Sequence, residues 1–400
     1  NVSLGGIWNN AGGTYTAGTN TTNFNGATAQ TITRAAGAEN FNHIGFSGAG
    51  TKTLGSAINC RNLTINAGSI VSAGVAGFTI SMIGSWSNAG TFDGGTSGIV
   101  LCNGTVAQTI GGTAVTNFRH LTIQNAAGVS ITSNQNLLGT LSLNSGMFTT
   151  TGFDFTLVSN VNGTGRIGAI TGGDITGDII QQRYIYQGPT AWRQLAAPVD
   201  GQTFQSWNDD IITAGFPGSD YPNMNGWFSI ASYNETALGW KEYGYVAPTN
   251  ITNPINPLMG YFVYVGPLAV TLDVKGIPRK FNQTFSLTYT PSAGPSEDGW
   301  NMLSNPYPSA IDWDAVGFTR TNTDQVLYIW NPAINQYASY VGGIGVNGGT
   351  AFVASSQAFW VRAIAPAPAV SITETVKTAQ DPTYFRSMLQ TVPYLLKLKL

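Results

Sequence analysis

The first 180 residues carry short runs in which apolar and polar residues alternate. Period-two alternation over a few residues is typical of half-buried strands. The runs are separated by Gly, Asn and Ser, and no helical period lies between them. The clearest runs are Leu63–Ile65, Phe78–Ile80, Leu121–Ile123, Val129–Ile131, Leu141–Leu143 and Phe155–Leu157. The pattern predicts many short strands joined by tight turns.

The same stretch repeats itself at an offset of 77 or 78 residues. Residues 8–12 (WNNAG) return as 86–90 (WSNAG), 24–32 (FNGATAQTI) as 102–110 (CNGTVAQTI), 41–44 (FNHI) as 118–121 (FRHL), and 63–68 (LTINAG) as 141–146 (LSLNSG). Short strands with a stacking period favour a β-solenoid resembling a parallel β-helix, with three or four turns in each repeat. A string of small β-sandwiches is the alternative.

Residues 1–180 are therefore predicted to hold two repeats and a cap. The cap is expected after Leu157, where the repeat departs from its pattern, as terminal units of solenoids do. Residues 2–6 resemble 80–84, so further repeats are expected upstream. The side chains expected to point inward are those of Leu63, Ile65, Leu121, Ile123, Leu141 and Leu143.

The second half has a different composition. Only Trp8 and Trp86 of the ten tryptophans precede residue 181, which predicts a conventional aromatic-rich β core afterwards. A weaker duplication aligns 192–198 with 300–306 and 257–264 with 355–362. We therefore predict two similar β-sandwich-like domains, 181–290 and 296–378, joined by a linker at 291–295. Residues 379–400 are expected to be a linker and the start of a further β domain.

Charge narrows the classes of function. Only 9% of residues are charged, the net charge is -2, and no basic stripe is visible, so nucleic acid is excluded as a partner. No apolar run is long enough to span a bilayer as a helix. Cys60 and Cys102 are too few for a disulfide framework, and their pairing stays open. Low charge with abundant Gly, Asn and Thr favours an exported protein.

Two signatures resemble those of large repeat-containing cell-surface proteins of Bacteroidota that are exported by type IX secretion. One is Trp-x-Asn-x-Gly, Asn-Gly-x-x-x-Gln-Thr-Ile and Phe-x-His-Leu-x-Ile within residues 8–123. The other is 299–314 (GWNMLSNPYPSAIDWD) with 357–361 (QAFWV). The resemblance implies an extracellular or cell-surface location and contact with the type IX secretion machinery during export. It implies no particular activity.

The titratable side chains give no catalytic constellation. His43 and His120 occupy the same repeat position, and stacked turns about 4.8 Å apart would hold them too far apart for one metal ion, so packing is expected. Asp312 with Asp314, and the pair Asp209–Asp210, are the densest carboxylates. A structural turn is the prediction for Asp312, with calcium binding or glycosidic chemistry as alternatives.

The remaining candidates also favour structural roles. Gln30 and Gln108 beside turn glycines are expected to make amide hydrogen bonds along the solenoid, Cys102 to be a small buried hydrophobe, and 342–345 (GGIG) to be a turn rather than a phosphate loop. Six tryptophans are expected mainly in the core, with a carbohydrate platform as the alternative. These are Trp192, Trp227, Trp240, Trp313, Trp330 and Trp360.

No catalytic, cofactor-binding or metal-binding residues are assigned, and no cofactor is expected. The sequence favours a non-catalytic structural or adhesive segment, an adhesin-like protein whose expected partners are surface glycans, neighbouring cells or other copies of itself. A polysaccharide-binding or polysaccharide-degrading β-helix protein is one alternative. The degrading form needs acids on one solenoid face, and residues 1–180 contain only five: Glu39, Asp93, Asp154, Asp174 and Asp178. A self-assembling filament or surface-layer subunit is the other alternative.

Overall fold

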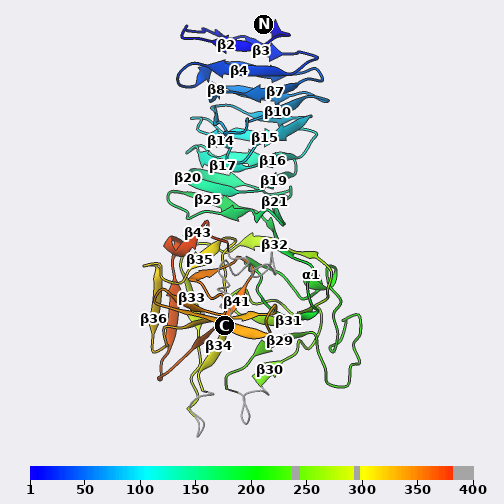
Figure 1. The fold of residues 1–400 in the computed structure, drawn as a ribbon, viewed down its shortest axis with the longest axis vertical. Helices are drawn as coiled ribbons and strands as arrows, with labels where there is room; N and C mark the ends of the chain where they lie inside the picture. The colour runs from blue at the N-terminus through cyan, green and yellow to red at the C-terminus, as the bar shows by residue number, and fades with distance from the viewer. Residues whose placement is uncertain (237–243, 292–297, 382–400) are drawn as a thin grey trace, which may run out of the picture.

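The computed structural model describes residues 1–236, 244–291 and 298–381. Its first half is a stack of short parallel strands that wind around three faces, with the N-terminus at the free end (Figure 1). Separate antiparallel sheets, rich in aromatic residues, follow it. The prediction of an all-β chain with an N-terminal β-solenoid and an aromatic-rich β region is confirmed.

Each of the first two faces holds nine strands. The first face holds β1 (Val2–Leu4), β3 (Thr21–Phe24), β6 (His43–Phe46), β9 (Asn62–Ile65), β12 (Trp86–Asn88), β15 (Gln108–Gly111), β18 (Val129–Ile131), β20 (Thr140–Thr149) and β25 (Gly173–Thr176). The second holds β2 (Trp8–Asn10), β4 (Gln30–Arg34), β7 (Thr51–Leu54), β10 (Ile70–Ser72), β13 (Thr91–Asp93), β16 (Thr116–Phe118), β19 (Gln135–Leu137), β21 (Phe155–Leu157) and β26 (Ile179–Ile185).

The third face begins later. It holds β5 (Glu39–Asn40), β8 (Ile58–Cys60), β11 (Ile80–Met82), β14 (Ile99–Cys102), β17 (His120–Gln124), the start of β20, and β24 (Arg166–Ile167). A small hairpin, β22 (Ser159–Asn160) with β23 (Gly163–Thr164), is inserted between β21 of the second face and β24 of the third. Because β20 runs around a corner, it joins the first and third faces into one sheet.

Alternation decides which side chains enter the stack. Leu63, Ile65, Leu121, Ile123 and Leu141 have no exposed surface, and Leu143 is 1% exposed. Parallel register places like residues above one another, so Leu121 pairs with Leu141 and Ile123 with Leu143. The predicted inward set is confirmed. Burying each such side chain stabilises the stack by about 1.5–3 kcal/mol relative to exposing it.

The sequence repeat and the turns of the stack do not coincide. Along the first repeat the chain crosses a face of the stack eleven times. Ten of these crossings are the strands β1 to β10, and the eleventh is a strandless stretch at residues 11–20. With three faces in a turn, one repeat spans three and two-thirds turns. Equivalent residues therefore lie on different faces: Trp8 is in β2 on the second face, and Trp86 is in β12 on the first. The second repeat is rotated by one face relative to the first.

The second half contains two copies of one strand order. In the first copy the sheet runs β27 (Ala191–Leu195), β31 (Tyr261–Val265), β29 (Ile230–Tyr233), β30 (Tyr245–Val246). In the second it runs β34 (Trp300–Ser304), β41 (Ala358–Arg362), β37 (Leu327–Asn331), β38 (Gln336–Val341), with β39 (Ile344–Val346) added. Each copy also pairs the strand before this sheet with the strand after it, β26 with β32 (Val270–Pro278) and β33 (Gln283–Ser286) with β42 (Ala369–Ile372).

Shorter elements complete the two copies. They are β28 (Val199–Asp200), α1 (Gln205–Asn208), β35 (Ala310–Asp312), β36 (Phe318–Thr321), β40 (Phe352–Val353), the 3-10 turn η2 (Glu374–Val376) and β43 (Lys377–Thr378). We call the part from β26 to β32 the first copy and the part from β33 to β42 the second copy. Among the described residues, no helix has the length and apolar character needed to cross a membrane.

One strand belongs to both halves. β26 pairs in parallel with β21, as the last strand of the second face, and antiparallel with β32 along its whole length. The predicted boundary after residue 180 falls inside this strand. Antiparallel β32 covers the strand edge that the last turn would otherwise leave open, which is a common way to protect a sheet edge. Independent folding of 181–290 and 296–378 stays a prediction, and most of 379–400 lies outside the described residues.

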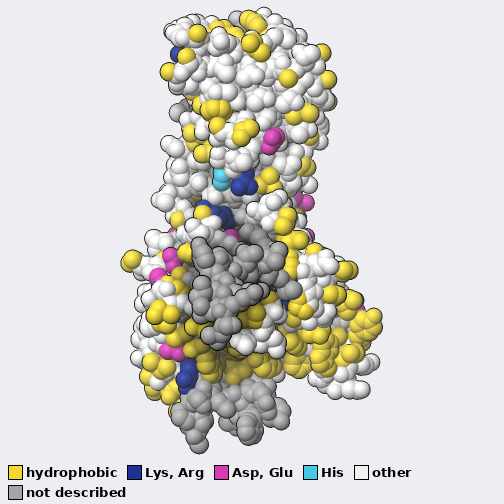
Figure 2. All heavy atoms as spheres, viewed as in Figure 1, with side chains coloured by type: hydrophobic (Ala, Val, Ile, Leu, Met, Phe, Trp, Pro, Cys, Tyr) yellow, Lys and Arg dark blue, Asp and Glu magenta, His cyan; other side chains and the backbone are white. Residues whose placement is uncertain are grey.

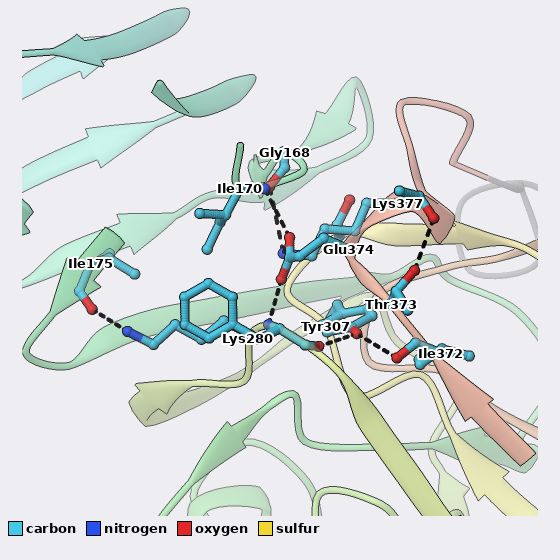
Figure 3. A network of polar contacts seen from close by, with 12 residues as sticks. Gly168, Ile170, Ile175, Lys280, Tyr307, Ile372, Thr373, Glu374 and Lys377 are labelled. Carbon is cyan, nitrogen blue, oxygen red and sulfur yellow. Dashed lines mark hydrogen bonds and ion pairs between the residues drawn. The ribbon is translucent and has the colours of Figure 1, made fainter. Parts of the chain in front are cut away.

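A partly buried polar network also joins the halves (Figure 3). Glu374 accepts hydrogen bonds from the backbone N–H of Ile170 in the stack, at 2.9 Å, and of Phe281 in the connection between the copies, at 2.6 Å. It forms an ion pair with Lys377 at 2.7 Å, and the Lys377 side chain has no exposed surface. One carboxylate thus holds three segments that are far apart in sequence.

Candidate functional site

The glutamines of the repeat are structural, as predicted. Gln30 Nε2 donates to the carbonyls of Leu4 and Gly6 in the preceding turn, at 2.9 and 2.6 Å, and its Oε1 accepts from Gly26 N at 2.8 Å. Gln108 makes the same three bonds at the same distances, on Met82, Gly84 and Gly104. A Cβ on Gly26 would lie 2.7 Å from the Gln30 side chain, which explains the Asn-Gly-x-x-x-Gln spacing. Both amides tie neighbouring turns together, so they bind backbone rather than ligand.

The Trp-x-Asn-x-Gly signature is a second internal hydrogen-bond set. Trp86 Nε1 and Asn88 Nδ2 both donate to Thr116 Oγ1, at 3.1 and 3.2 Å. In the first repeat Trp8 and Asn10 donate in the same way to Glu39 Oε2, at 3.0 and 2.8 Å. The Asn side chain also accepts from the backbone N–H of the motif glycine in both repeats. Sequence reasoning did not find this pairing, although the two acceptors stand at equivalent repeat positions.

The two histidines lie on different faces. His43 opens β6 on the first face, and its Nδ1 lies 3.0 Å from Asn62 Nδ2 in the next turn. His120 opens β17 on the third face, and its Nδ1 accepts from Thr140 N at 3.0 Å. They share no site. Within the described residues, no three His, Cys, Asp or Glu side chains gather in a way that would hold a metal ion.

The carboxylates are also dispersed. Asp312 Oδ1 accepts from Asp314 N at 3.0 Å, which is the predicted turn, and Asp314 accepts from the Tyr340 hydroxyl. Asp210 accepts from Asp273 N at 2.8 Å, and burial followed by the neighbouring acids raises the pKa of Asp210 to about 6. The stack acids do not converge, because Glu39 pairs with Arg34, Asp154 with Lys275, and Asp174 with Lys280.

The cysteines and the glycine run match their predicted roles. Cys60 and Cys102 are free and buried, and Met82 lies between them on the third face. Burial raises the pKa of both thiols to about 12, so neither is a nucleophile at neutral pH. Gly342 and Gly343, both with positive φ, form the tight turn between β38 and β39.

The tryptophans divide into buried rings and one surface group. Trp313 and Trp360 are 1% and 5% exposed, in agreement with a core role. Trp240 lies outside the described residues. Trp192, Trp227 and Trp330, in contrast, line one groove of about 520 Å³ between the two copies. The predicted core role holds only in part for these three, since Trp192 and Trp330 are half-buried and Trp227 is 40% exposed.

This aromatic groove is built from both copies. We define it by nine residues: Trp192, Gly226, Trp227, Phe228, Ala231, Tyr245, Phe262, Trp330 and Tyr337. They come from β27, the loop before β29, β29, β30 and β31 of the first copy, and from β37 and β38 of the second. Figure 2 shows hydrophobic side chains gathered over this half of the molecule, while the stack is mostly polar and uncharged.

Contacts among the rings fix the shape of the groove. On one wall the Trp192 and Trp227 ring centroids lie 6.4 Å apart, and both pack on Tyr264 at 5.3 Å. On the other wall Trp330 packs edge-on against Tyr337 at 5.0 Å. Gln194 of the first copy crosses between the walls, since its Oε1 accepts from Trp330 N at 2.6 Å. The buried Gln194 therefore joins β27 of the first copy to Trp330, a groove residue of the second copy.

The groove carries polar tips but no carboxylate. Burial, and then the neighbouring Tyr337, raises the pKa of Tyr245, and burial likewise raises the pKa of Tyr337, so both phenols stay neutral at ordinary pH. Tyr337 OH accepts from Trp360 Nε1 at 3.2 Å. No Asp, Glu, His or Lys is among the described residues that line the groove. It offers ring faces and neutral hydrogen-bonding groups, which suit binding better than acid–base chemistry.

Comparison with known proteins gives no relative for this site. No protein-family model matches the chain, and neither the curated proteins nor the solved structures give a match. The functional argument therefore rests on the geometry of the chain itself.

Proposed function

We propose that this chain is a non-catalytic, adhesive segment of an extracellular surface protein, in which the aromatic groove binds glycans and the solenoid holds it at a distance. The single observation that carries the proposal is the groove itself. Seven of its nine residues are aromatic, and they come from two copies that face each other. Its volume lies in the range of ordinary small-ligand sites.

A sugar ring suits this lining. One face of a pyranose presents C–H groups, which pack on aromatic faces, and its edge presents hydroxyls, which need neutral donors and acceptors. Trp and Tyr supply both, with large rigid contact area at small conformational cost. The phenols of Tyr245 and Tyr337 stay protonated over the neutral range and hydrogen-bond to each other at the edge of the ring faces.

Binding without cleavage is favoured over polysaccharide degradation. Glycoside hydrolysis ordinarily uses two carboxyl groups about 5–9.5 Å apart across the bond. The described residues of the groove provide none. Three of the five stack acids, Glu39, Asp154 and Asp174, are engaged in separate ion pairs rather than gathered on one face. Cell-surface location and export by type IX secretion are part of the proposal and rest on the sequence signatures.

The test is a binding panel of neutral and acidic oligosaccharides, read by titration calorimetry, with Trp227→Ala as the site variant. Phe153→Ala is the matched control, because Phe153 is a comparably exposed aromatic in the stack, at 39%. We expect at least one glycan to bind, and Trp227→Ala to weaken it tenfold or more, about 1.4 kcal/mol, with Phe153→Ala unchanged.

Two results would overturn the proposal. One is a parent chain that binds no glycan of the panel, or binds with an affinity that Trp227→Ala leaves intact. The other is the appearance of shortened products during the titration, which would replace binding with turnover.

A further inference from the structure

A second, polar cleft lies where the third face of the stack meets the second copy. It has a volume of about 330 Å³. The stack side of the cleft includes Arg119, His120, Thr140 and Arg166, and the other side includes Ala310, Ser355 and Asp381. The walls are fixed to each other next to the cleft, because Ile167 N donates to Pro308 O at 2.8 Å. This cleft shares no residue with the aromatic groove.

Register places the stack residues of the cleft one above another. Leu121 pairs with Leu141, and Thr140 pairs with Arg166, so His120, Thr140 and Arg166 open consecutive strands of the third face. Consecutive turns are about 4.8 Å apart. Arg119 directly precedes His120 in the chain. The imidazole and the Arg119 guanidinium are thus carried on one turn of a rigid sheet, and the Arg166 guanidinium is carried two turns further along, with Thr140 between them.

Positive charge exceeds negative charge around the cleft. Besides Arg119 and Arg166, the buried Arg183 donates to Ser355 Oγ at 2.7 Å, and Lys377 is close enough to Arg166 for their charges to interact. The facing acids are Asp381, which lies 3.6 Å from Arg183 and also faces Arg166, and Glu374, which is paired with Lys377. Two guanidinium groups and one carboxylate therefore line the cleft, and two further cations and one further carboxylate lie next to it. In a chain with only 17 Lys and Arg among 400 residues, this is a marked concentration.

The imidazole of His120 is oriented to donate. Its Nδ1 accepts from Thr140 N, so the neutral ring carries its proton on Nε2. Within the described part of the chain, Nε2 makes no hydrogen bond, and it is not sealed away from solvent. A free N–H beside two guanidinium groups is a donor set for an oxyanion.

The equivalent position of the first repeat lacks this charge. His43 lies in a shallow groove with Thr21, Asn23, Asn62 and Thr64, and none of the residues that line it is Arg or Lys. The position before His43 is Asn42, where the second repeat has Arg119. Two histidines at the same repeat position therefore differ in whether arginine side chains surround them, which makes His43 an internal control.

We propose that the cleft at His120 is an oxyanion-binding site, in which Arg119, Arg166 and His120 Nε2–H hold the sulfate or carboxylate group of an acidic ligand. Arg and His pair with such groups through charge-assisted hydrogen bonds, and the planar guanidinium matches their geometry. Burial, then the charges of Arg119 and Arg166, lowers the pKa of His120. A bound anion offsets that repulsion, so binding raises this pKa and strengthens as the pH falls through it.

The test uses the two imidazole signals of the whole chain in proton NMR. Sodium sulfate and sodium glucuronate are titrated separately at constant ionic strength with chloride. We expect the His120 signal to shift in a saturable, millimolar titration and its pKa to rise, while His43 stays unchanged. Arg119→Gln and Arg166→Gln should each weaken the effect tenfold or more, and Arg61→Gln, an arginine outside the cleft, should not. Thermal unfolding of each variant reports whether it is folded.

The two anions distinguish the sources of the ligand. Saturation by sulfate alone assigns the site to sulfate esters or free sulfate, and saturation by glucuronate assigns it to acidic sugars. The proposal is overturned if neither anion shifts His120 beyond His43, or if folded Arg119→Gln and Arg166→Gln respond as the parent does. Because the readout is remote from the aromatic groove, either result leaves glycan binding there to its own test.

Discussion

The stack and the aromatic half use the same residue types in opposite ways. Trp86 in the stack is 1% exposed and donates its indole N–H to Thr116 inside the molecule. Trp227 in the aromatic half is 40% exposed and contributes its ring to a groove. Polar side chains differ likewise: Gln30 and Gln108 are buried and fully engaged with backbone, whereas the phenol of Tyr337 lines the groove.

In the proposed function, the stack gives support and the aromatic half recognises the ligand. The Gln and Trp-x-Asn signature residues of the stack form bonds between turns, so these parts of the repeat preserve a scaffold. The duplicated half instead places rings from two copies opposite each other, and only their combination forms the groove. A duplicated fold can thus create a site that neither copy holds alone.

The largest expected effect is in the stack. Leu143→Asp places a carboxylate at a position 1% exposed, opposite Ile123 in the neighbouring turn. A buried charge without a partner costs several kcal/mol, so the variant should lose the stack altogether. Far-UV circular dichroism during heating measures this.

Ser142→Asp is the matched control, because Ser142 is the neighbour that points away from the core and is partly exposed. It should melt close to the parent. If Leu143→Asp melts like the parent as well, the inward assignment of the stack is wrong.

The next effect concerns the joint between the regions. Glu374→Ala leaves the fully buried Lys377 without its carboxylate and removes the acceptor of Ile170 N and Phe281 N. Breaking a buried pair in this way costs about 3–5 kcal/mol. Urea unfolding should show a large shift of the midpoint.

Asp154→Ala serves as comparison, because it removes an exposed pair with Lys275 that crosses the same joint. That change should cost at most about 1 kcal/mol. Equal shifts for the two variants would contradict a joint that depends on Glu374.

The smallest expected effect comes from Glu39, the position at which the first repeat has a carboxylate and the second has Thr116. Burial raises the pKa of Glu39, but hydrogen bonds from Trp8, Asn10 and Asn40 N, with the charge of Arg34, lower it overall. Its stabilisation is present above the ordinary Glu pKa and is lost as the pH falls through the lower folded value. Glu39→Thr, which copies Thr116 of the second repeat, should cost about 1 kcal/mol at pH 7 and remove this part of the acid sensitivity.

Urea midpoints of the parent and Glu39→Thr between pH 3 and 7 give the measurement. The two curves should converge as the pH falls through the folded pKa of Glu39. Curves that stay parallel to the lowest pH would show that Glu39 is not linked to folding.

The alternation of apolar and polar residues and the repeat offset predicted the parts of the fold that depend on residues close together in sequence or at a fixed spacing. The run Leu63–Ile65 and the offset of 78 residues were sufficient to predict the stacked strands. The rotation of the second repeat by one face was not predictable, because it depends on how many faces each turn has. The contact of Glu374 with Ile170 spans 204 residues and leaves no periodic trace.

The groove shows the same limit. Alternation correctly placed Trp313 and Trp360 in the core, because that property belongs to one strand. It did not reveal that Trp192, Trp227 and Trp330 meet, since their meeting depends on how two sheets pack around Gln194. The acceptors of the Trp-x-Asn motif lie 28 to 31 residues from it, so they were missed for a related reason.

Hydrogen–deuterium exchange of the whole chain, with and without a glycan that binds it, tests the division between support and recognition most directly. The account predicts slower exchange in the loop at 226–228 and in β30, β37 and β38, with β1 to β18 unchanged. Protection confined to the strands of the stack, with the groove unaffected, would contradict it.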